Sequence, residues 1–288
     1  MKSDRRGRAS SQSLKRSILI RKTVSYVVLT LGALIMIMPF LWSISTSLKL
    51  PSEVFAWPPQ WIPAPPRFDA YLEVFRGISF GKNLSNTFVI SIMVSVGQLI
   101  TCSMAGYAFA KLRFPGRNTL FLAYLATMMV PGIVIIIPNF VVMRHLGWLD
   151  SHKALIIPAL TSAYGTFLMR QFFLTFPTEL EDAAKLDGCN PITFYWHILL
   201  PNSKPILATL GVLTFQNIWN DFLWPLIILS SQEKRTLQVG LSYLQNANYA
   251  DWTLLMAGSV ITVLPLIVLF FFAQRYFIQS IKLSGLKG

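Results

Sequence analysis

Long apolar windows, separated by short polar segments, recur along this chain. Six windows supply the roughly 20 apolar residues that a helix needs to cross a bilayer core of about 30 Å. They are continuously apolar and lack the short alternating pattern of membrane β-strands. The predicted spans are Thr23–Thr46, Asn86–Lys111, Leu120–Met143, Ala154–Phe173, Pro205–Leu229 and Thr253–Phe277. The pattern therefore predicts an all-α membrane protein with six transmembrane helices.

Prolines and small residues recur inside these windows. Prolines in a helical bundle kink the helices, and neighbouring groups or water then satisfy the freed carbonyls. In the second window, small residues permit close packing against another helix. The prolines are Pro39, Pro131, Pro138, Pro158, Pro225 and Pro265, and the small residues are Ser91, Ser95, Gly97, Thr101, Ala105 and Gly106.

Composition agrees with a membrane protein. Hydrophobic residues make up 53% of the 288 positions and charged residues only 13%, about half the share typical of soluble domains. The first 22 residues are polar and basic and have no cleavable-looking signal, so the first span is predicted to be an uncleaved anchor. The expected organisation is a basic tail at 1–22, a transmembrane domain at 23–278 and a short tail at 279–288.

The distribution of positive charge predicts the orientation. Seventeen of the 25 lysines and arginines lie in segments on the same side as the N-terminus. Because cytoplasmic loops carry the excess of basic residues, both termini are predicted to be cytoplasmic. The net charge of +13 does not indicate nucleic acid binding, since the basic residues flank spans and do not cover one soluble face. Cys102 and Cys189 show no metal-binding spacing.

The segment "LEDAAKLDGCNPITFYWHILLP", residues 180–201, is a polar interruption between the fourth and fifth spans. Thr178 and Glu181 have the spacing of a capping box, which predicts a helix over 179–186. Gly188 can take the left-handed conformation that ends helices. Asn190 and Pro191 then favour a second helix that ends before Pro201. The loop at about 177–204 is therefore predicted to be a helical hairpin on the inner membrane surface.

The first helix of this hairpin has a nearly bare patch at Ala183 and Ala184, where another backbone can approach closely. Acidic residues surround the patch on an otherwise basic cytoplasmic side: Glu179, Glu181, Asp182 and Asp187. The pattern fits a knob that inserts into a groove on a partner protein. A solvated interfacial loop is an equally good interpretation on these grounds.

The hairpin resembles the EAA loop of ATP-binding cassette importer permeases. The matching positions are Asp182, Ala183, Ala184, Gly188, Ile198, Leu200 and Pro201, with Asp182 where the motif usually has Glu. Other segments resemble the carbohydrate branch of this binding-protein-dependent transport family, in particular the maltose-type second permease. They are "FLWSISTSLK", "PSEVFAWPPQWIPAPP", "NIWNDFLWPLIIL" and "QRYFIQSIKLSGLKG".

The resemblance implies that the loop is a coupling helix between the spans and two ATP-binding subunits. Its coupling residues would be Glu181, Asp182, Ala183, Ala184, Asp187, Gly188, Ile198, Leu200 and Pro201. The other implied partners are a homologous second permease, an extracellular solute-binding protein and membrane lipid, in a bacterial or archaeal cytoplasmic membrane. The chain has no GxxxxGK[ST] motif, so ATP and Mg²⁺ are expected on the partner subunits, with no enzyme activity or cofactor in this chain.

A polar stripe in the fifth span is the candidate substrate path. Its members fall at positions i, i+3, i+6, i+7 and i+10, which share one face of a continuous helix: Thr214, Asn217, Asn220, Asp221 and Trp224. Polar residues within a span usually face a pathway or a partner. Amides, a carboxylate and an indole suit a sugar, but hydrogen bonding to the partner permease explains the stripe equally well. Gln98 and Asn139 are weaker candidates.

Three other functions are compatible with these sequence features. A similar permease can import a non-sugar solute such as glycerol phosphate. A stand-alone secondary carrier is a second alternative, although it predicts inverted repeats and broken-helix ion sites, which the sequence does not display. A non-transporting scaffold in a membrane complex is the third.

Overall fold

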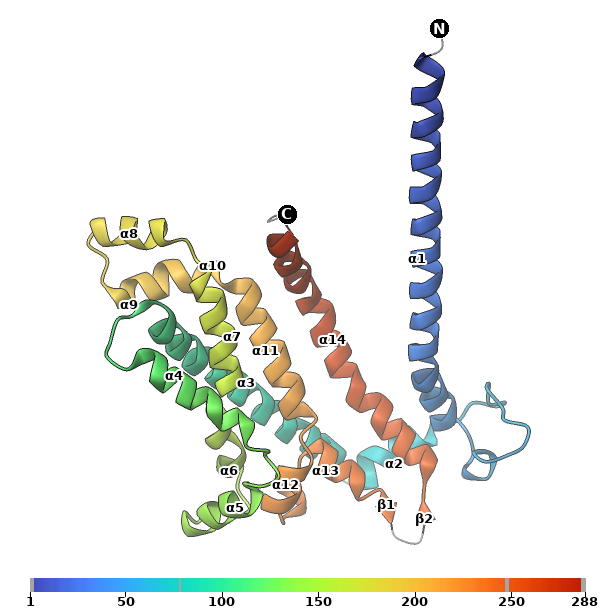
Figure 1. The fold of residues 1–288 in the computed structure, drawn as a ribbon. Helices are drawn as coiled ribbons and strands as arrows, with labels where there is room; N and C mark the ends of the chain where they lie inside the picture. The colour runs from blue at the N-terminus through green and yellow to red at the C-terminus, as the bar shows by residue number, and fades with distance from the viewer. Residues whose placement is uncertain (1–2, 78, 247–248, 286–288) are drawn as a thin grey trace. The chain divides into compact units, whose positions relative to one another are not determined.

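The computed structural model describes residues 3–77, 79–246 and 249–285, and it is almost entirely helical (Figure 1). The longer α-helices are α1 (Ser3–Ser47), α3 (Phe80–Lys111), α7 (Ala163–Leu174), α11 (Lys204–Trp219) and α14 (Trp252–Gly285). The shorter ones are α2 (Asp69–Gly77), α4 (Arg117–Ala126), α5 (Ile136–His145), α6 (Lys153–Ile156), α8 (Thr178–Leu186), α9 (Pro191–Phe194), α10 (Leu200–Asn202), α12 (Leu223–Ile228) and α13 (Leu237–Ser242).

Other secondary structure is confined to short connections. The 3₁₀ turns are η1 (Pro51–Glu53), η2 (Thr127–Met129), η3 (Pro158–Leu160) and η5 (Gln232–Lys234), and η4 (Tyr195–Leu199) is a π-helical turn. The strands β1 (Gln245–Asn246) and β2 (Tyr249–Ala250) pair antiparallel, with Gln245 opposite Ala250. This pair involves only two residues on each side, and the described chain has the all-α class that the sequence predicts.

Three described helices are long and apolar enough to cross a membrane. They are Ile18–Ser47 within α1, all of α3, and Trp252–Tyr276 within α14. A fourth candidate combines Pro191–Asn202 with Lys204–Trp219, two segments bent by 79°. The three continuous helices contain or closely match the first, second and sixth predicted windows.

The three middle windows were expected to be continuous helices, and this expectation is wrong. The window at 120–143 is split between α4 and α5, that at 154–173 between α6 and α7, and that at 205–229 between α11 and α12. Each break lies close to a proline, namely Pro131, Pro158 or Pro225. A proline cannot donate to the carbonyl four residues earlier, and its ring clashes with it. Three prolines therefore interrupt the windows that hydropathy alone joins.

The bundle around α3 contains all the candidate site residues. They belong to one compact unit, Leu72–Ala250 with Ile261–Gly288. Within it, α3 makes its most extensive contacts with α7 and α11. Gly106 lies against Met169 and Arg170 of α7, which confirms at this position the predicted close packing of small residues in the second window. In Figure 1, α8 and α9 lie at one end of α7 and α11, and α5, α6 and α12 at the other.

Candidate functional site

The first helix of the polar hairpin, α8, covers Thr178–Leu186 and thus confirms the predicted helix over 179–186. The predicted capping box is wrong. Thr178 is already helical, and the N-cap residue is Pro177, which offers no side-chain acceptor. The Thr-x-x-Glu spacing is the same whether the threonine caps the helix or lies in its first turn. The Glu181 carboxylate is consequently available for ion pairing.

The turn between α8 and α9 follows the predicted chemistry. Gly188 has φ +80°, where residues with a Cβ are strained. Its N–H bonds to the Lys185 carbonyl at 3.0 Å, and the Cys189 N–H bonds to the Ala184 carbonyl at 2.9 Å. These two bonds form a Schellman motif that satisfies the last carbonyls of α8. The turn therefore depends on a glycine at 188.

The second helix of the hairpin begins as predicted. The Asn190 Oδ1 accepts a hydrogen bond from the Thr193 N–H at 2.8 Å, and Pro191 is the first helical residue. The prediction that this helix ends before Pro201 is wrong, because η4 and α10 continue it to Asn202. The π turn leads directly into Pro201, which has no N–H for a regular i−4 bond. Wider turns of this kind are frequent at functional sites.

The structure corrects the role predicted for the alanine patch. Ala184 is only 4% exposed and belongs to a buried cluster with Tyr107 and Phe194. Its small side chain therefore seats α8 on this chain's own core and is not available to a partner. Ala183 is exposed. Ile198 and Leu200 pack against the same cluster.

An ion pair also fixes α8 to α3. The Glu181 carboxylate lies 3.5 Å from the Lys111 Nζ, and the two side chains are 18% and 8% exposed. The Lys111 Nζ also donates to the Phe176 carbonyl at 3.1 Å. By contrast, Asp182 is 71% exposed and, within the described part of the chain, pairs only with Lys185, at 3.4 Å. The substitution of Asp for the usual Glu thus falls on an exposed acid, while Glu181 makes the contact with the bundle.

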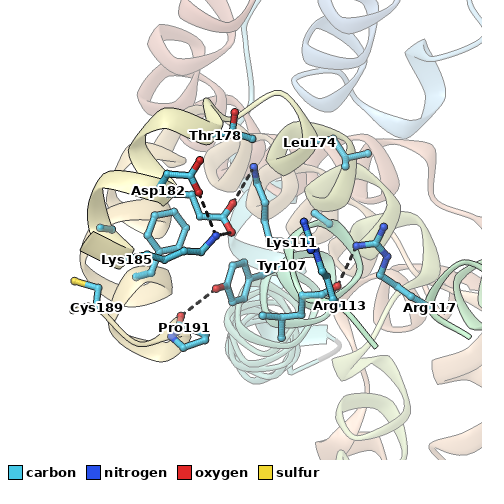
Figure 2. Close-up of a pocket in the computed structure, with 15 residues that line it drawn as sticks. Tyr107, Lys111, Arg113, Arg117, Leu174, Thr178, Asp182, Lys185, Cys189 and Pro191 are labelled. Atoms are coloured by element: carbon cyan, nitrogen blue, oxygen red, sulfur yellow. Dashed lines mark hydrogen bonds and ion pairs between the residues drawn. The ribbon is translucent and has the colours of Figure 1, made fainter. Parts of the chain in front are cut away.

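A cleft of about 740 Å³ separates the hairpin from the end of α3 (Figure 2). Its residues come from the ends of α3 and α7, the start of α4, the connecting turns, α8 and α9, and they include Tyr107, Lys111, Arg113, Arg117, Glu181, Lys185 and Pro191. The Tyr107 hydroxyl donates to the Pro191 carbonyl at 3.1 Å across it. Hydrogen bonds from Lys185 first to Glu181 and then to Asp182 raise the pKa of the Lys185 ammonium. Lys185 therefore stays charged at neutral pH.

The polar stripe of the fifth span does not form one helical face. α11 ends at Trp219, and Asn220 is its C-cap residue. The single-face prediction is therefore wrong beyond Asn217, because it assumed a helix that continued through Trp224. Of the five residues, only Thr214 and Asn217 lie within α11.

Thr214 and Asn217 line a cavity of about 340 Å³ together with Gln98 of α3. The Thr214 hydroxyl donates to the Gln98 Oε1 at 2.9 Å, and the Gln98 Nε2 donates to the Ala159 carbonyl at 2.8 Å. The remaining lining residues are Ser162, Tyr164, Leu210 and Leu213. Gln98, ranked lower from the sequence, is thus central to the cavity. Ser162 and Tyr164 were missed, because no helical period connects them to α11.

The other members of the stripe lie elsewhere. Trp224 donates its Nε1–H to the Ala154 carbonyl at 3.1 Å, which is a structural contact between α12 and α6. Asn220 is exposed and donates to the Gln216 carbonyl at 3.0 Å. Asp221 borders a different and much smaller hollow, together with Thr87. The structure therefore separates these three residues from the cavity around Gln98.

A polar clasp at the opposite end of the bundle from α8 was not predicted. Asp150, in the turn before α6, has φ +53° and accepts hydrogen bonds from the N–H groups of Ser230 and Ser231, at 3.0 and 2.9 Å. Its Oδ2 lies 3.0 Å from the Lys234 Nζ. Hydrogen bonds from the Ser231 hydroxyl, then from the Ser231 N–H, and more weakly from Lys234, lower the pKa of the Asp150 carboxyl well below its usual range. No local motif joins residues about 80 positions apart, so only the fold reveals the clasp.

We expect Asp150→Asn to destabilise the protein by about 1.5–3 kcal/mol at neutral pH, the usual size of hydrogen bonds to a charged group. Asparagine tolerates positive φ, so the backbone is preserved. Because folding lowers this pKa, the charge stabilises the protein above the unfolded value of 3.8 and loses that effect as the pH falls below it. Thermal denaturation at several pH values measures the difference between wild type and variant.

The matched control is Asp69→Asn, because Asp69 is 60% exposed and pairs only with Arg67 among the described residues. It should change the denaturation temperature little at any pH. A difference for Asp150→Asn that stayed constant from pH 7 to pH 3 would contradict the charged clasp.

The apolar helices, the polar hairpin at one end of the bundle and the polar cavity within it define a helical membrane protein of the transport class. Residues 98–283 match the family described as binding-protein-dependent transport system inner membrane component, and the chain belongs to that family. It is a membrane-spanning permease subunit of an importer.

Similar proteins support the assignment. The arabinooligosaccharides transport system permease protein AraQ of Halalkalibacterium halodurans is 40% identical over 203 residues, covering 70% of this chain and 73% of that protein. The sn-glycerol-3-phosphate transport system permease protein UgpE of Yersinia pestis bv. Antiqua is 34% identical over 264 residues, covering 89% and 94%. A chain from the crystal structure of a bacterial ABC transporter involved in the import of the acidic polysaccharide alginate superposes with a TM-score of 0.80. It is 29% identical and covers 91% of this chain and 98% of that one. These matches confirm the predicted membership of the importer permeases of the carbohydrate branch.

Proposed function

We propose that this chain is one of two membrane subunits of an ATP-driven importer for an uncharged oligosaccharide and works by alternating access. In this proposal it has six spans, both termini are cytoplasmic, and residues 177–204 couple the spans to two ATP-binding subunits. A homologous permease and an extracellular solute-binding protein complete the transporter, and ATP and Mg²⁺ bind to the partner ATPases.

The observation that carries the coupling role is the two-sided character of α8. One side is held by Ala184 and by the pair between Glu181 and Lys111. The other side presents Leu186, which is 90% exposed and lies between the exposed residues Asp182 and Ala183. An apolar side chain with a charged surround is a common anchor at protein interfaces. A partner that pulled on this face would transmit force to α3 through the buried side.

The cavity around Gln98 supports the substrate class. The described residues that line it are all uncharged, with amides at Gln98 and Asn217, hydroxyls at Ser162 and Thr214, and an aromatic ring at Tyr164. Amides and hydroxyls hydrogen-bond sugar hydroxyls, and an aromatic ring can cover an apolar sugar face. A glycerol phosphate or an acidic polysaccharide would need cationic partners in its path. An uncharged oligosaccharide therefore fits this cavity best.

We expect Asn217→Ala to weaken transport through this cavity. The loss of one hydrogen bond, about 0.5–1.5 kcal/mol, corresponds to an increase of roughly 2- to 12-fold in the substrate concentration needed for half-maximal uptake. The measurement is uptake of a radiolabelled arabinooligosaccharide by proteoliposomes that contain the complete transporter.

Asn220→Ala is the matched control, because Asn220 is exposed beyond the end of α11. It should leave the concentration dependence of uptake unchanged. Equal effects of the two variants, or no effect of Asn217→Ala, would remove Asn217 from the substrate path.

Co-purification tests the assignment as a whole. A tagged full-length chain extracted in mild detergent should carry an ATP-binding subunit and a second permease, and uptake should require ATP. Uptake by the isolated chain, driven by an ion gradient without ATP, would favour a secondary carrier. Recovery of the chain without an ATPase, together with the absence of any uptake, would favour a scaffold.

A further inference from the structure

A second hollow lies beside the cleft of the hairpin, where α3 turns into α4. It measures about 520 Å³ and is lined by Arg113, Phe114, Gly116, Arg117, Asn118 and Thr119. Figure 2 shows Arg113 and Arg117 close to each other, on the α3–α4 side of the cleft. The Arg117 Nη1 donates to the Leu112 carbonyl at 3.0 Å, which holds this guanidinium in place. The hollow thus has a fixed cation at its edge.

The positive charge of this hollow is not balanced by acids. Residues 111–126 contain no Asp or Glu. Among the described residues, no carboxylate lies within ion-pair distance of Arg113 or Arg117. Arg113 and Arg117 also border the neighbouring cleft, but the acids there, Glu181 and Asp182, pair with lysines. Two guanidinium groups without counter-charges favour an anionic occupant.

A third guanidinium adds to this charge. Arg170 of α7 lies over the Phe121 ring, with its Cζ 4.1 Å from the ring centroid, and donates to the Phe109 carbonyl at 3.2 Å. Phe121 is one turn beyond Arg117 on α4. The start of α4 is therefore positive on two sides.

The wall next to the hollow is apolar. Leu120, one residue beyond the lining residue Thr119, is 56% exposed on the first turn of α4, and Phe114, which is 36% exposed, borders the hollow itself. Basic residues followed directly by exposed apolar residues match the boundary between headgroups and acyl chains in a bilayer. A free anion would use the arginines and leave the apolar wall without a role.

We propose that this hollow binds the headgroup of an anionic phospholipid of the cytoplasmic leaflet, with Arg113 and Arg117 on the phosphate and the acyl chains along Phe114 and Leu120. The inference goes beyond the transport role but rests on the proposed topology, which places the turn from α3 to α4 on the cytoplasmic side. The bound lipid fixes the start of α4 against the hairpin that receives the ATPases.

Native mass spectrometry of the complete transporter, in mild detergent with added phosphatidylglycerol or phosphatidylcholine, tests the proposal. The double variant Arg113→Gln/Arg117→Gln should bind about fivefold less phosphatidylglycerol than wild type. Its binding of phosphatidylcholine should be unchanged. The control Arg67→Gln/Arg76→Gln removes the same charge from a predicted outer segment and should bind like wild type. Equal phosphatidylglycerol binding by all three proteins would overturn the proposal.

Three further results separate the alternatives. Displacement of phosphatidylglycerol by millimolar inorganic phosphate would overturn the lipid assignment in favour of a free-anion site. A photo-cross-linking residue placed at position 118 should label lipid. Labelling of the second permease instead would show that the hollow faces that subunit, and would overturn the lipid site. Modification of Asn118→Cys by a membrane-impermeant thiol reagent added from the outside would overturn the proposed topology and with it the lipid site. A wild-type transporter that binds phosphatidylglycerol as expected but shows no ATP-driven uptake would contradict the proposed transport function and leave the lipid site standing.

Discussion

Replacement of Ala184 by arginine is expected to reduce ATP-driven uptake to less than about a tenth of the wild-type rate and to lower the stability of the chain. Ala184 is 4% exposed in the cluster that holds α8 on α3. Burial of a guanidinium there without a partner costs several kcal/mol. We therefore expect α8 to detach from the buried cluster. Uptake by proteoliposomes and thermal denaturation of the purified transporter measure the two effects.

The comparison with Ala183→Arg separates burial from docking. Ala183 is the exposed neighbour on the same helix, so the same substitution should leave thermal stability unchanged. Its effect, if the coupling role is correct, is confined to uptake and to ATPase stimulation. Wild-type stability and uptake in Ala184→Arg would contradict the seating of α8.

Gly106→Ala is expected to have the second-largest effect. A Cβ at this position would lie 2.7 Å from the Met169 Cβ and 3.0 Å from the Arg170 backbone nitrogen. A backbone atom cannot move aside as the end of a side chain can, so α3 and α7 must separate. Overpacking of this kind costs about 1–3 kcal/mol, and the gain in helix propensity, about 1 kcal/mol, offsets only part of it.

Gly97→Ala on the same helix is the control. There the nearest neighbour is the Leu160 side chain, whose tip can change rotamer. Its denaturation temperature should be close to that of wild type or higher. A similar fall in denaturation temperature in both variants would contradict the claim that the close approach of the α7 backbone requires glycine at position 106.

Local signals predicted the hairpin well, because its turn is determined by residues close in sequence. Gly188 ends α8, and Asn190 with Pro191 starts α9, as expected from their own conformational preferences. The capping box failed because Thr178 and Glu181 keep the same spacing in two different registers. Hydropathy also joined α11 to α12, although Pro225 removes the donor that would bond to the carbonyl of Asp221.

The candidate site was only partly predictable, because burial depends on contacts distant in sequence. Ala183 and Ala184 look equivalent in the sequence, yet adjacent helical residues point about 100° apart and only one of them faces the core. Gln98 became central to the cavity through Thr214, 116 positions away. Asp150 and Ser231 meet in the same way, and no periodicity links them.

The central claim is that α8 receives the ATP-binding subunit, and site-specific photo-cross-linking from Leu186 in the assembled transporter tests it most directly. Leu186 is 90% exposed, and the control position Leu146, at the other end of the bundle, is 51% exposed. We expect a covalent product between Leu186 and the ATP-binding subunit and none from Leu146. Cross-links from Leu186 to lipid or solvent alone, in a transporter that hydrolyses ATP and imports substrate, would contradict it.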